Sequence, residues 1–193
     1  MKKDIILAGV GGQGILSIAA VIGLAAIEKG LFVKQAEVHG MSQRGGAVQS
    51  HLRISSNEIA SDLIPAGEAD MILSVEPMES LRYLPFLSND GWIITNSTPF
   101  VNIPNYPEMK LLLDQINSYK NVIVINADET AKKIGSLKSS NVVLLGASSE
   151  HLDIPYRNLE SGIRQLFGKK GESVVQLNLA ALKAGADLVS EKK

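Results

Sequence analysis

The sequence contains no cysteine, and this absence limits the chemistry open to the chain. On its own the chain can hold no disulfide, no thiolate-ligated iron–sulfur cluster and no cysteine nucleophile. If the protein takes part in redox chemistry, another molecule must supply the electron carrier. Aromatic residues are also scarce, at 5 % against 45 % hydrophobic residues in all, so the core must be built from Ala, Val, Ile and Leu. That mixture is typical of a parallel sheet covered by helices.

Net charge and long hydrophobic runs are lacking too. The formal net charge is −1, which excludes the strongly basic surface that nucleic acids and anionic membranes attract. The longest apolar stretch, residues 18–27, is shorter than the roughly 20 residues that cross a bilayer. Asp4 and the glycines after it interrupt any signal-peptide core. We therefore expect a cytoplasmic protein with no nucleic-acid or membrane partner.

Hydrophobic patterning predicts a single α/β domain over residues 1–193. We expect a Rossmann-like sheet, mostly parallel, with helices on both faces and a helical C-terminal part. The alternating strand near 47–54 comes too soon after the strand at 31–36 for the crossover that a parallel neighbour needs. That strand should therefore run antiparallel or lie at an edge of the sheet.

Two local predictions are less direct. Asn89, Asp90 and Gly91 predict a turn just before a strand at 92–95. The apolar run 141–145 suits a buried strand or a helix, and the serines just before it favour a helix because serine caps helix N-termini.

The first of two glycine-rich loops follows the apolar run at 5–7. Its glycines have the spacing of a dinucleotide-binding turn between a strand and a helix. In such a turn glycine allows a tight bend and a close backbone approach, and the amides at the helix N-terminus favour an anion. The alternative is a purely structural tight turn. The candidate residues are Gly9, Gly11, Gly12, Gln13 and Gly14.

The helix expected after this loop is unusual, because from Ile15 to Ile27 the only side chain with a polar group is Ser17. A helix that is apolar all round must be buried all round. It therefore predicts a partner surface, either another subunit or a second copy of the chain. The alternative is that the C-terminal helices of the same chain cover it.

The second glycine-rich loop breaks the dinucleotide-binding plan. Glu37 stands where that plan needs an acid at the end of the second strand. The few residues after it predict a projecting loop rather than a helix, which counts against a conventional NAD enzyme. Arg44 could hold a phosphate or carboxylate through two parallel hydrogen bonds, and His39 could titrate near neutrality. The alternative is a surface loop that packs against a partner. The candidate residues are Glu37, His39, Gly40, Met41, Ser42, Gln43, Arg44, Gly45 and Gly46.

The remaining polar residues predict no catalytic constellation and no metal site. His51 and His151 have no companion at metal-ligand spacing. Glu76, before Pro77, is either a functional group at a strand end or an acid that favours the following helix dipole. No paired carboxylates stand out.

Taken together, the two loops resemble the gamma-type subunit or domain of the 2-oxoacid:ferredoxin oxidoreductases. The resemblance spans the whole chain and looks strongest to the indolepyruvate type. It is carried by Gly11–Gly14, by Arg44–Gly46, and by Ile64–Asp70 ahead of a strand that ends in Glu76–Pro77.

The resemblance implies a role inside a larger enzyme. Such enzymes decarboxylate a 2-oxoacid oxidatively, join the acyl group to coenzyme A and pass electrons to ferredoxin. The indolepyruvate type acts on aryl pyruvates. Thiamine diphosphate and the iron–sulfur clusters would be held by a larger partner subunit, and this chain would bind no cofactor alone. It would pack beside the thiamine-bearing part and help to enclose the approach of coenzyme A.

Other functions stay open from the sequence. A sister enzyme acting on pyruvate, a branched-chain 2-oxoacid or 2-oxoglutarate would share the same motifs. From another class, the chain could be a free-standing nucleotide-binding protein that uses Gly9–Gly14 and Glu37, or a homo-oligomeric scaffold joined through its apolar helix.

Overall fold

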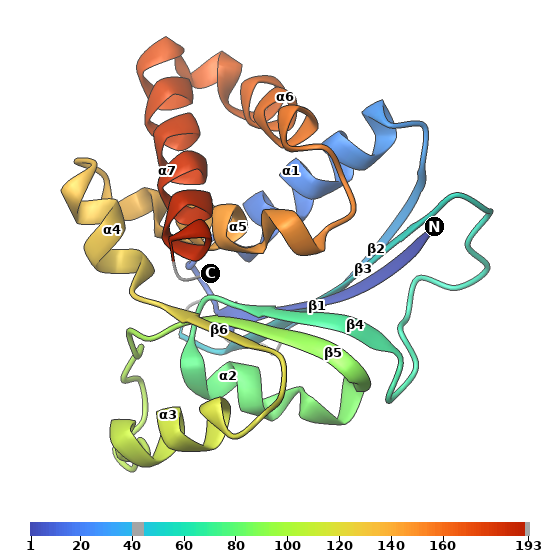
Figure 1. The fold of residues 1–193 in the computed structure, drawn as a ribbon. Coiled ribbons are helices and arrows are strands. Elements are labelled where there is room, and N and C mark those ends of the chain that lie inside the picture. Colours follow the sequence, from blue (N-terminus) through green and yellow to red (C-terminus); the bar gives the residue numbers. More distant parts are fainter. Residues whose placement is uncertain (40–44, 192–193) are drawn as a thin grey trace.

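The computed structural model describes residues 1–39 and 45–191. Within them, six strands form one mixed sheet. The strands are β1 (Lys2–Val10), β2 (Phe32–His39), β3 (Ala47–Ser55), β4 (Ala69–Ser74), β5 (Leu87–Asn96) and β6 (Val122–Ile125). Their order in the sheet is β2-β3-β1-β4-β5-β6 (Figure 1). β1, β4, β5 and β6 are parallel neighbours, whereas β3 runs antiparallel to both β1 and β2.

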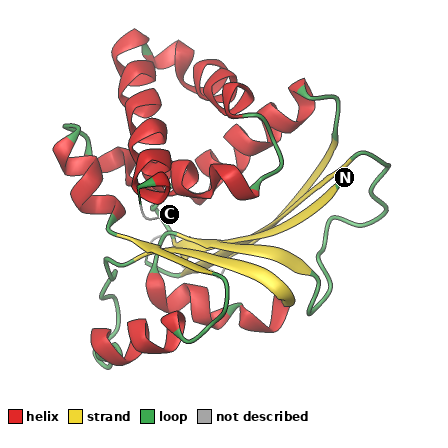
Figure 2. Cartoon of the chain, in the orientation of Figure 1, coloured by secondary structure: helices red, strands yellow, loops and turns green. Residues whose placement is uncertain are grey.

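Helices cover both faces of this sheet, which confirms the predicted α/β architecture (Figure 2). α2 (Pro77–Arg82) and α3 (Met109–Asn117) lie on one face. The other face carries α1 (Ile15–Glu28), α4 (Ala127–Lys133), α5 (Ser140–Ser148), α6 (Tyr156–Phe167) and α7 (Glu172–Ser190). Among the described residues, no helix is both long enough and apolar enough to cross a membrane.

β3 lies inside the sheet and is antiparallel, so the first of the two predicted possibilities holds and β2 forms the edge. The short connection after β2 returns the chain as a hairpin. β3 then pairs with β1 along its full length, from Lys2 opposite Ser55 to Val10 opposite Ala47. α1 still carries the chain from β1 to a parallel β2, but β3 occupies the place between them.

The turn predicted at Asn89–Asp90–Gly91 is wrong, because these residues belong to β5. The pairing of β5 with β4 is irregular there, moving from Ala69 opposite Leu87 to Met71 opposite Trp92. β5 has more residues than β4 across this register shift, and two of them, Asn89 and Asp90, are exposed. A local irregularity in the ladder therefore replaces the expected break in the chain.

The predicted partner surface along α1 is wrong for most of that helix, and the alternative cover by C-terminal helices is confirmed. α6 packs on α1 so closely that a Cβ atom added to Gly162 would lie 2.7 Å from the carbonyl oxygen of Val21. The large hydrophobic side chains of α1 that stay exposed are Leu16 and Ile27, near its two ends. A homo-oligomer joined along this helix is not needed to bury it.

The ambiguous run 141–145 is helical, as the serine caps favour. Every residue of α5 after Ser140 is buried, which explains why its sequence lacks an amphipathic pattern. α7 packs against it, and the two backbones come close at Gly146 and Gly185.

Candidate functional site

The carboxyl ends of β1, β2, β4, β5 and β6 share one edge of the sheet, where ligands bind in open α/β folds. The loops after β1 and β2 meet there. The amide of Gly11 donates to the carbonyl oxygen of Gly46 at 2.9 Å, and the amide of Gly45 donates to the carbonyl oxygen of Gly11 at 3.4 Å. These bonds continue the β1–β3 ladder beyond Val10 and Ala47. The first glycine-rich loop and the described end of the second, Gly45 and Gly46, are therefore joined.

The first loop is held by its own glutamine. The side-chain oxygen of Gln13 accepts from the amide of Val10 at 2.8 Å, and the amide of Gln13 donates to the carbonyl oxygen of Val10 at 3.1 Å. Gly12 and Gly14 have φ values of 101° and 80°, a region that side chains other than glycine rarely adopt. At Gly9, an added Cβ atom would lie 2.3 Å from a methyl group of Val75. The backbone angles and the packing of the turn therefore require glycine at these positions whether or not a ligand binds there.

These bonds also limit where an anion could bind. The amides of Gly11 and Gln13 already donate within the protein. α1 begins at Ile15 with Gly14 as its N-cap, and the amide of Ser17 donates to the carbonyl oxygen of Gly14 at 3.0 Å. Helix geometry leaves the amides of Ile15 and Leu16 without an acceptor inside the helix, so they are the candidates for an anion. The side chain of Asn141 fixes this cap from α5 by donating to the carbonyl oxygen of Gly14 at 3.0 Å.

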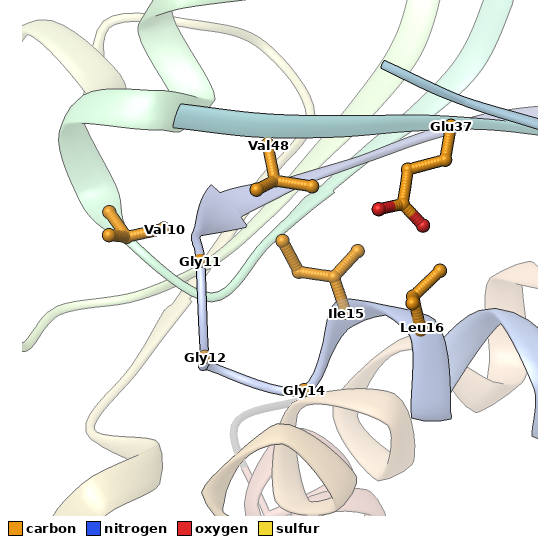
Figure 3. A pocket seen from close by; sticks show the side chains of 8 residues that line it. All are labelled: Val10, Gly11, Gly12, Gly14, Ile15, Leu16, Glu37 and Val48. Carbon is orange, nitrogen blue, oxygen red and sulfur yellow. The ribbon is translucent and has the colours of Figure 1, made fainter. Parts of the chain in front are cut away.

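A pocket of about 410 Å³ opens beside the turn (Figure 3). Its walls are mainly apolar, and Glu37 from β2 supplies the one charged group among its lining residues. The carboxylate of Glu37 points towards Ile15 and Leu16 (Figure 3). The lining residues are Val10, Gly11, Gly12, Gly14, Ile15, Leu16, Glu37 and Val48. Chemically, the pocket suits an apolar group that carries a hydrogen-bond donor, and the carboxylate opposes a phosphate placed deep inside it.

A second, smaller pocket of about 160 Å³ lies on the other side of the turn. It shares Gly12 with the first and is lined mainly by polar side chains from the ends of β5, α4 and α5. These include Asn96, Asp128, Lys138, Ser140 and Asn141. Asn96 is held by the amide of Ala127, which donates to its side-chain oxygen at 3.0 Å.

Glu76, the N-cap of α2, also lies at this edge of the sheet. The sequence indicated its role at the start of a helix but not its other contacts. The side chain is fully buried and caps α2 by accepting from the amide of Glu79 at 2.9 Å. Its other oxygen accepts from the amide of Phe100 at 3.3 Å and from the hydroxyl of Tyr106. Burial raises the pKa of Tyr106, and the carboxylate of Glu76 raises it further. Tyr106 stands 30 positions after Glu76, so no local pattern could have paired them.

Glu79 was also missed, since no paired carboxylates stand out in the sequence. It is 2 % exposed beside Glu76 and accepts from the guanidinium of Arg82 at 2.9 Å. Burial raises the pKa of its carboxyl group. The pair lies under the sheet rather than in either pocket, so its evident role is to hold α2 and the loop after β5.

Several predicted site residues lie outside the described part of the chain. Gly40, Met41, Ser42, Gln43 and Arg44 are among them, and so is the side chain of His39, the last residue of β2. The predictions for these groups therefore stay predictions.

The other histidines have structural contacts. His51 is buried, its Nδ1 atom accepts from the amide of Ile64 at 3.0 Å, and its ring meets that of Phe86 edge-on. His151 lies against Trp92, with ring centroids 3.9 Å apart. Across residues 1–39 and 45–191, no three His, Cys, Asp or Glu side chains are grouped as a metal ion would require.

Known proteins match this chain along its whole length. A family model described as pyruvate ferredoxin/flavodoxin oxidoreductase matches residues 4–188. The indolepyruvate oxidoreductase subunit IorB of Archaeoglobus fulgidus is 38 % identical over 194 residues, which cover 96 % of this chain and 94 % of that protein. The protein of the same name from Methanothermobacter thermautotrophicus is 36 % identical, covering 99 % of this chain and 100 % of that protein.

A solved structure shares the fold. The 2-oxoglutarate:ferredoxin oxidoreductase from Magnetococcus marinus, with 2-oxoglutarate, coenzyme A and succinyl-CoA bound, matches with a TM-score of 0.78 and 25 % identity. The match covers 98 % of this chain but only 31 % of that one. The motifs of the two glycine-rich loops, the family match and the shared fold agree, and the chain belongs to the pyruvate ferredoxin/flavodoxin oxidoreductase family.

Proposed function

We propose that this chain, as a single domain over residues 1–193, is the smaller subunit of an indolepyruvate-type 2-oxoacid:ferredoxin oxidoreductase. The observation that carries the proposal is the identity of 38 % to an indolepyruvate oxidoreductase subunit over nearly the full length of both proteins. The complex would decarboxylate aryl pyruvates oxidatively, form the aryl-acetyl-CoA and pass the electrons to ferredoxin in the cytoplasm. A larger subunit would hold thiamine diphosphate and the iron–sulfur clusters, because this chain has no cysteine to ligate a cluster.

Activity of the assembled complex tests this proposal. The chain and the larger subunit from the same organism are produced together, and ferredoxin reduction is followed with indolepyruvate and coenzyme A. We expect turnover by the complex and none by the chain alone. Faster turnover of pyruvate, a branched-chain 2-oxoacid or 2-oxoglutarate would assign the chain to a sister enzyme. Turnover by the isolated chain would contradict a subunit role.

Within the complex, we propose that the joined glycine loops hold an anionic group, such as part of coenzyme A. Two features support this. The amides of Ile15 and Leu16 have no acceptor inside the helix, and in sequence Arg44 directly precedes Gly45 and Gly46, which bond to the first turn. The carboxylate of Glu37 favours a place for the anion outside the apolar pocket.

Substitution of Arg44 tests that role. Loss of a charge-assisted hydrogen bond to an anion costs about 1.5–3 kcal/mol, so Arg44→Ala should raise the KM for coenzyme A by about tenfold or more. Arg44→Lys should recover part of the loss, and Lys169→Ala serves as the control because that exposed cation lies in the α6–α7 connection. Light scattering would confirm that each complex still assembles. An unchanged KM in an intact Arg44→Ala complex would refute the role.

A nucleotide-binding protein is the second candidate, favoured by one observation. The structure places Glu37 and the Gly11–Gly14 turn in one pocket, as a ribose-binding acid and a phosphate turn would be placed. A thermal-shift measurement on the isolated chain with NAD, FAD, ATP and coenzyme A separates the candidates. A ligand at 100 times its Kd stabilises the folded state by about 2.7 kcal/mol, which is easily detected.

A further inference from the structure

The segment 97–108, which joins β5 to α3, presents apolar side chains to solvent. Val101 is 67 % exposed and Phe100 is 42 % exposed, and Ile103 is 36 % exposed two positions further on. Large exposed hydrophobic side chains occur elsewhere in the described residues, but no other three stand within four positions of one another. Glu108 is the only charged residue of the segment. Apolar side chains with little charge are typical of the centre of a protein interface.

This segment is also held in place, which distinguishes it from a loosely attached loop. Glu76 fixes it at two points, through the amide of Phe100 and the hydroxyl of Tyr106. Between these points, the side chain of Asn102 donates to the carbonyl oxygen of Gly45 at 2.6 Å. The segment also contains Pro99, Pro104 and Pro107, each of which restricts the backbone. A surface that is ordered before binding loses less conformational entropy when a partner covers it.

The bond to Gly45 places the segment against the joined glycine loops at the carboxyl edge of the sheet. Leu16, at the start of α1, and Leu137, just before α5, are half exposed at the same edge. Both line pockets that share Gly12. Exposed apolar side chains therefore occur both in the segment and beside the turn, at one edge of the sheet.

We propose that the segment 97–108 is a docking surface for the larger subunit of the oxidoreductase, and that this subunit meets it with an uncharged, apolar patch. The proposal rests on the proposed function. The choice of occupant is supported by the Magnetococcus enzyme, in which the matching part forms 31 % of a longer chain and is therefore covalently joined to the rest of that oxidoreductase chain. Glu76 acts as a positioning residue, since it holds the segment without being exposed itself.

The binding of single-residue variants to the larger subunit tests the proposal. The matched pair is Val101→Asp and Ile27→Asp, because the two side chains are 67 % and 61 % exposed. Ile27 lies in the last turn of α1, at the end of that helix remote from the Gly14 turn. We expect Val101→Asp to raise the Kd for the larger subunit by more than about 30-fold, because docking would bury an unpaired charge against apolar atoms. Ile27→Asp should leave the Kd within about threefold of the unsubstituted chain.

The outcomes are distinguishable. If the unsubstituted chain does not bind the larger subunit, the proposed function fails and this inference fails with it. If it binds and Val101→Asp binds equally well, or if both variants lose affinity alike, the proposed function stands and the docking surface is refuted. The far-UV circular dichroism of each variant shows whether it is folded. Should Val101→Asp not fold, Ile103→Ser replaces it, and an unchanged Kd for that variant would equally refute the surface.

Discussion

Replacing Gly185 with alanine should force α5 and α7 apart. A Cβ atom at Gly185 would lie 1.8 Å from the carbonyl oxygen of Val143, whereas real Cβ atoms essentially never come within 3.0 Å of such an atom. The facing position is equally tight, since a Cβ atom at Gly146 would lie 2.0 Å from the carbonyl oxygen of Leu182. The two helices must therefore separate by more than an ångström to admit one methyl group.

The size of the effect follows from two opposing terms. Overpacking a close-packed core costs about 1–3 kcal/mol, and the upper end applies because a helix carbonyl cannot rotate away as a side chain can. Alanine in place of glycine favours a helix by about 1 kcal/mol, which offsets part of that cost. We expect a net loss of about 2 kcal/mol in the free energy of unfolding. In a chain of this length the loss lowers Tm by about 4–8 °C.

Urea and thermal denaturation followed by far-UV circular dichroism measure this loss. Gly168→Ala is the control, because Gly168 has right-handed helical backbone angles and a Cβ atom there meets nothing within 4 Å. The control should unfold at the urea concentration of the unsubstituted chain or slightly above it. If Gly185→Ala unfolded there too, the close approach of α5 and α7 would not exist in solution.

Two further predictions concern buried polar groups. Tyr106→Phe removes a hydroxyl that donates to buried Glu76, so the free energy of unfolding, measured in urea, should fall by about 1–3 kcal/mol. A stability equal to that of the unsubstituted chain would show that this hydrogen bond contributes nothing. Burial, with a smaller effect of Arg53, lowers the pKa of His51, so the folded state binds its proton less readily than the unfolded chain does. The stability from this shift is complete above the unfolded pKa of about 6.5 and is lost as the pH falls towards the folded pKa, by at most about 1.4 kcal/mol per pH unit. His51→Asn should abolish that pH dependence. Buried Glu79 has the opposite effect on stability, but it is present in both the unsubstituted chain and the variant, so it cancels when the two are compared at each pH between about 7.5 and 5.5. If the stability curves of the two proteins ran parallel over that range, the assignment to His51 would be refuted.

The fold was predictable where local sequence decides the structure. The strand expected near 47–54 forms as β3, at Ala47–Ser55, because alternating apolar and polar residues are a local signal. The position of β3 in the sheet was only partly predictable. The short connection after β2 requires β3 to return antiparallel, but it does not decide whether β2 or β3 is the edge strand. That choice depends on the full-length pairing of β3 with β1, which is a contact between distant segments.

The candidate site was predictable as two loops and not as a unit. Spacing alone identified the Gly9–Gly14 turn, whereas its bond to Gly46 depends on the β1–β3 register. The covering of α1 by α6 was equally beyond local patterns, because α6 follows more than a hundred residues later. Polar contacts such as that of Glu76 with Tyr106 depend on the path of a whole loop, so they appear only in the folded chain.

The joined loops change the meaning of the glycine motif in this fold. In a dinucleotide-binding turn the backbone amides are free for a pyrophosphate, but here the amide of Gly11 donates to Gly46. The inserted strand β3 brings Gly45 and Gly46 to that position, and Asn102 holds the same loop from the other side. The turn thus uses one of its amides to fix Gly46, at the end of the second loop. This geometry favours a structural role for the Gly11 amide and leaves the amides of Ile15 and Leu16 as the candidates for holding an anion.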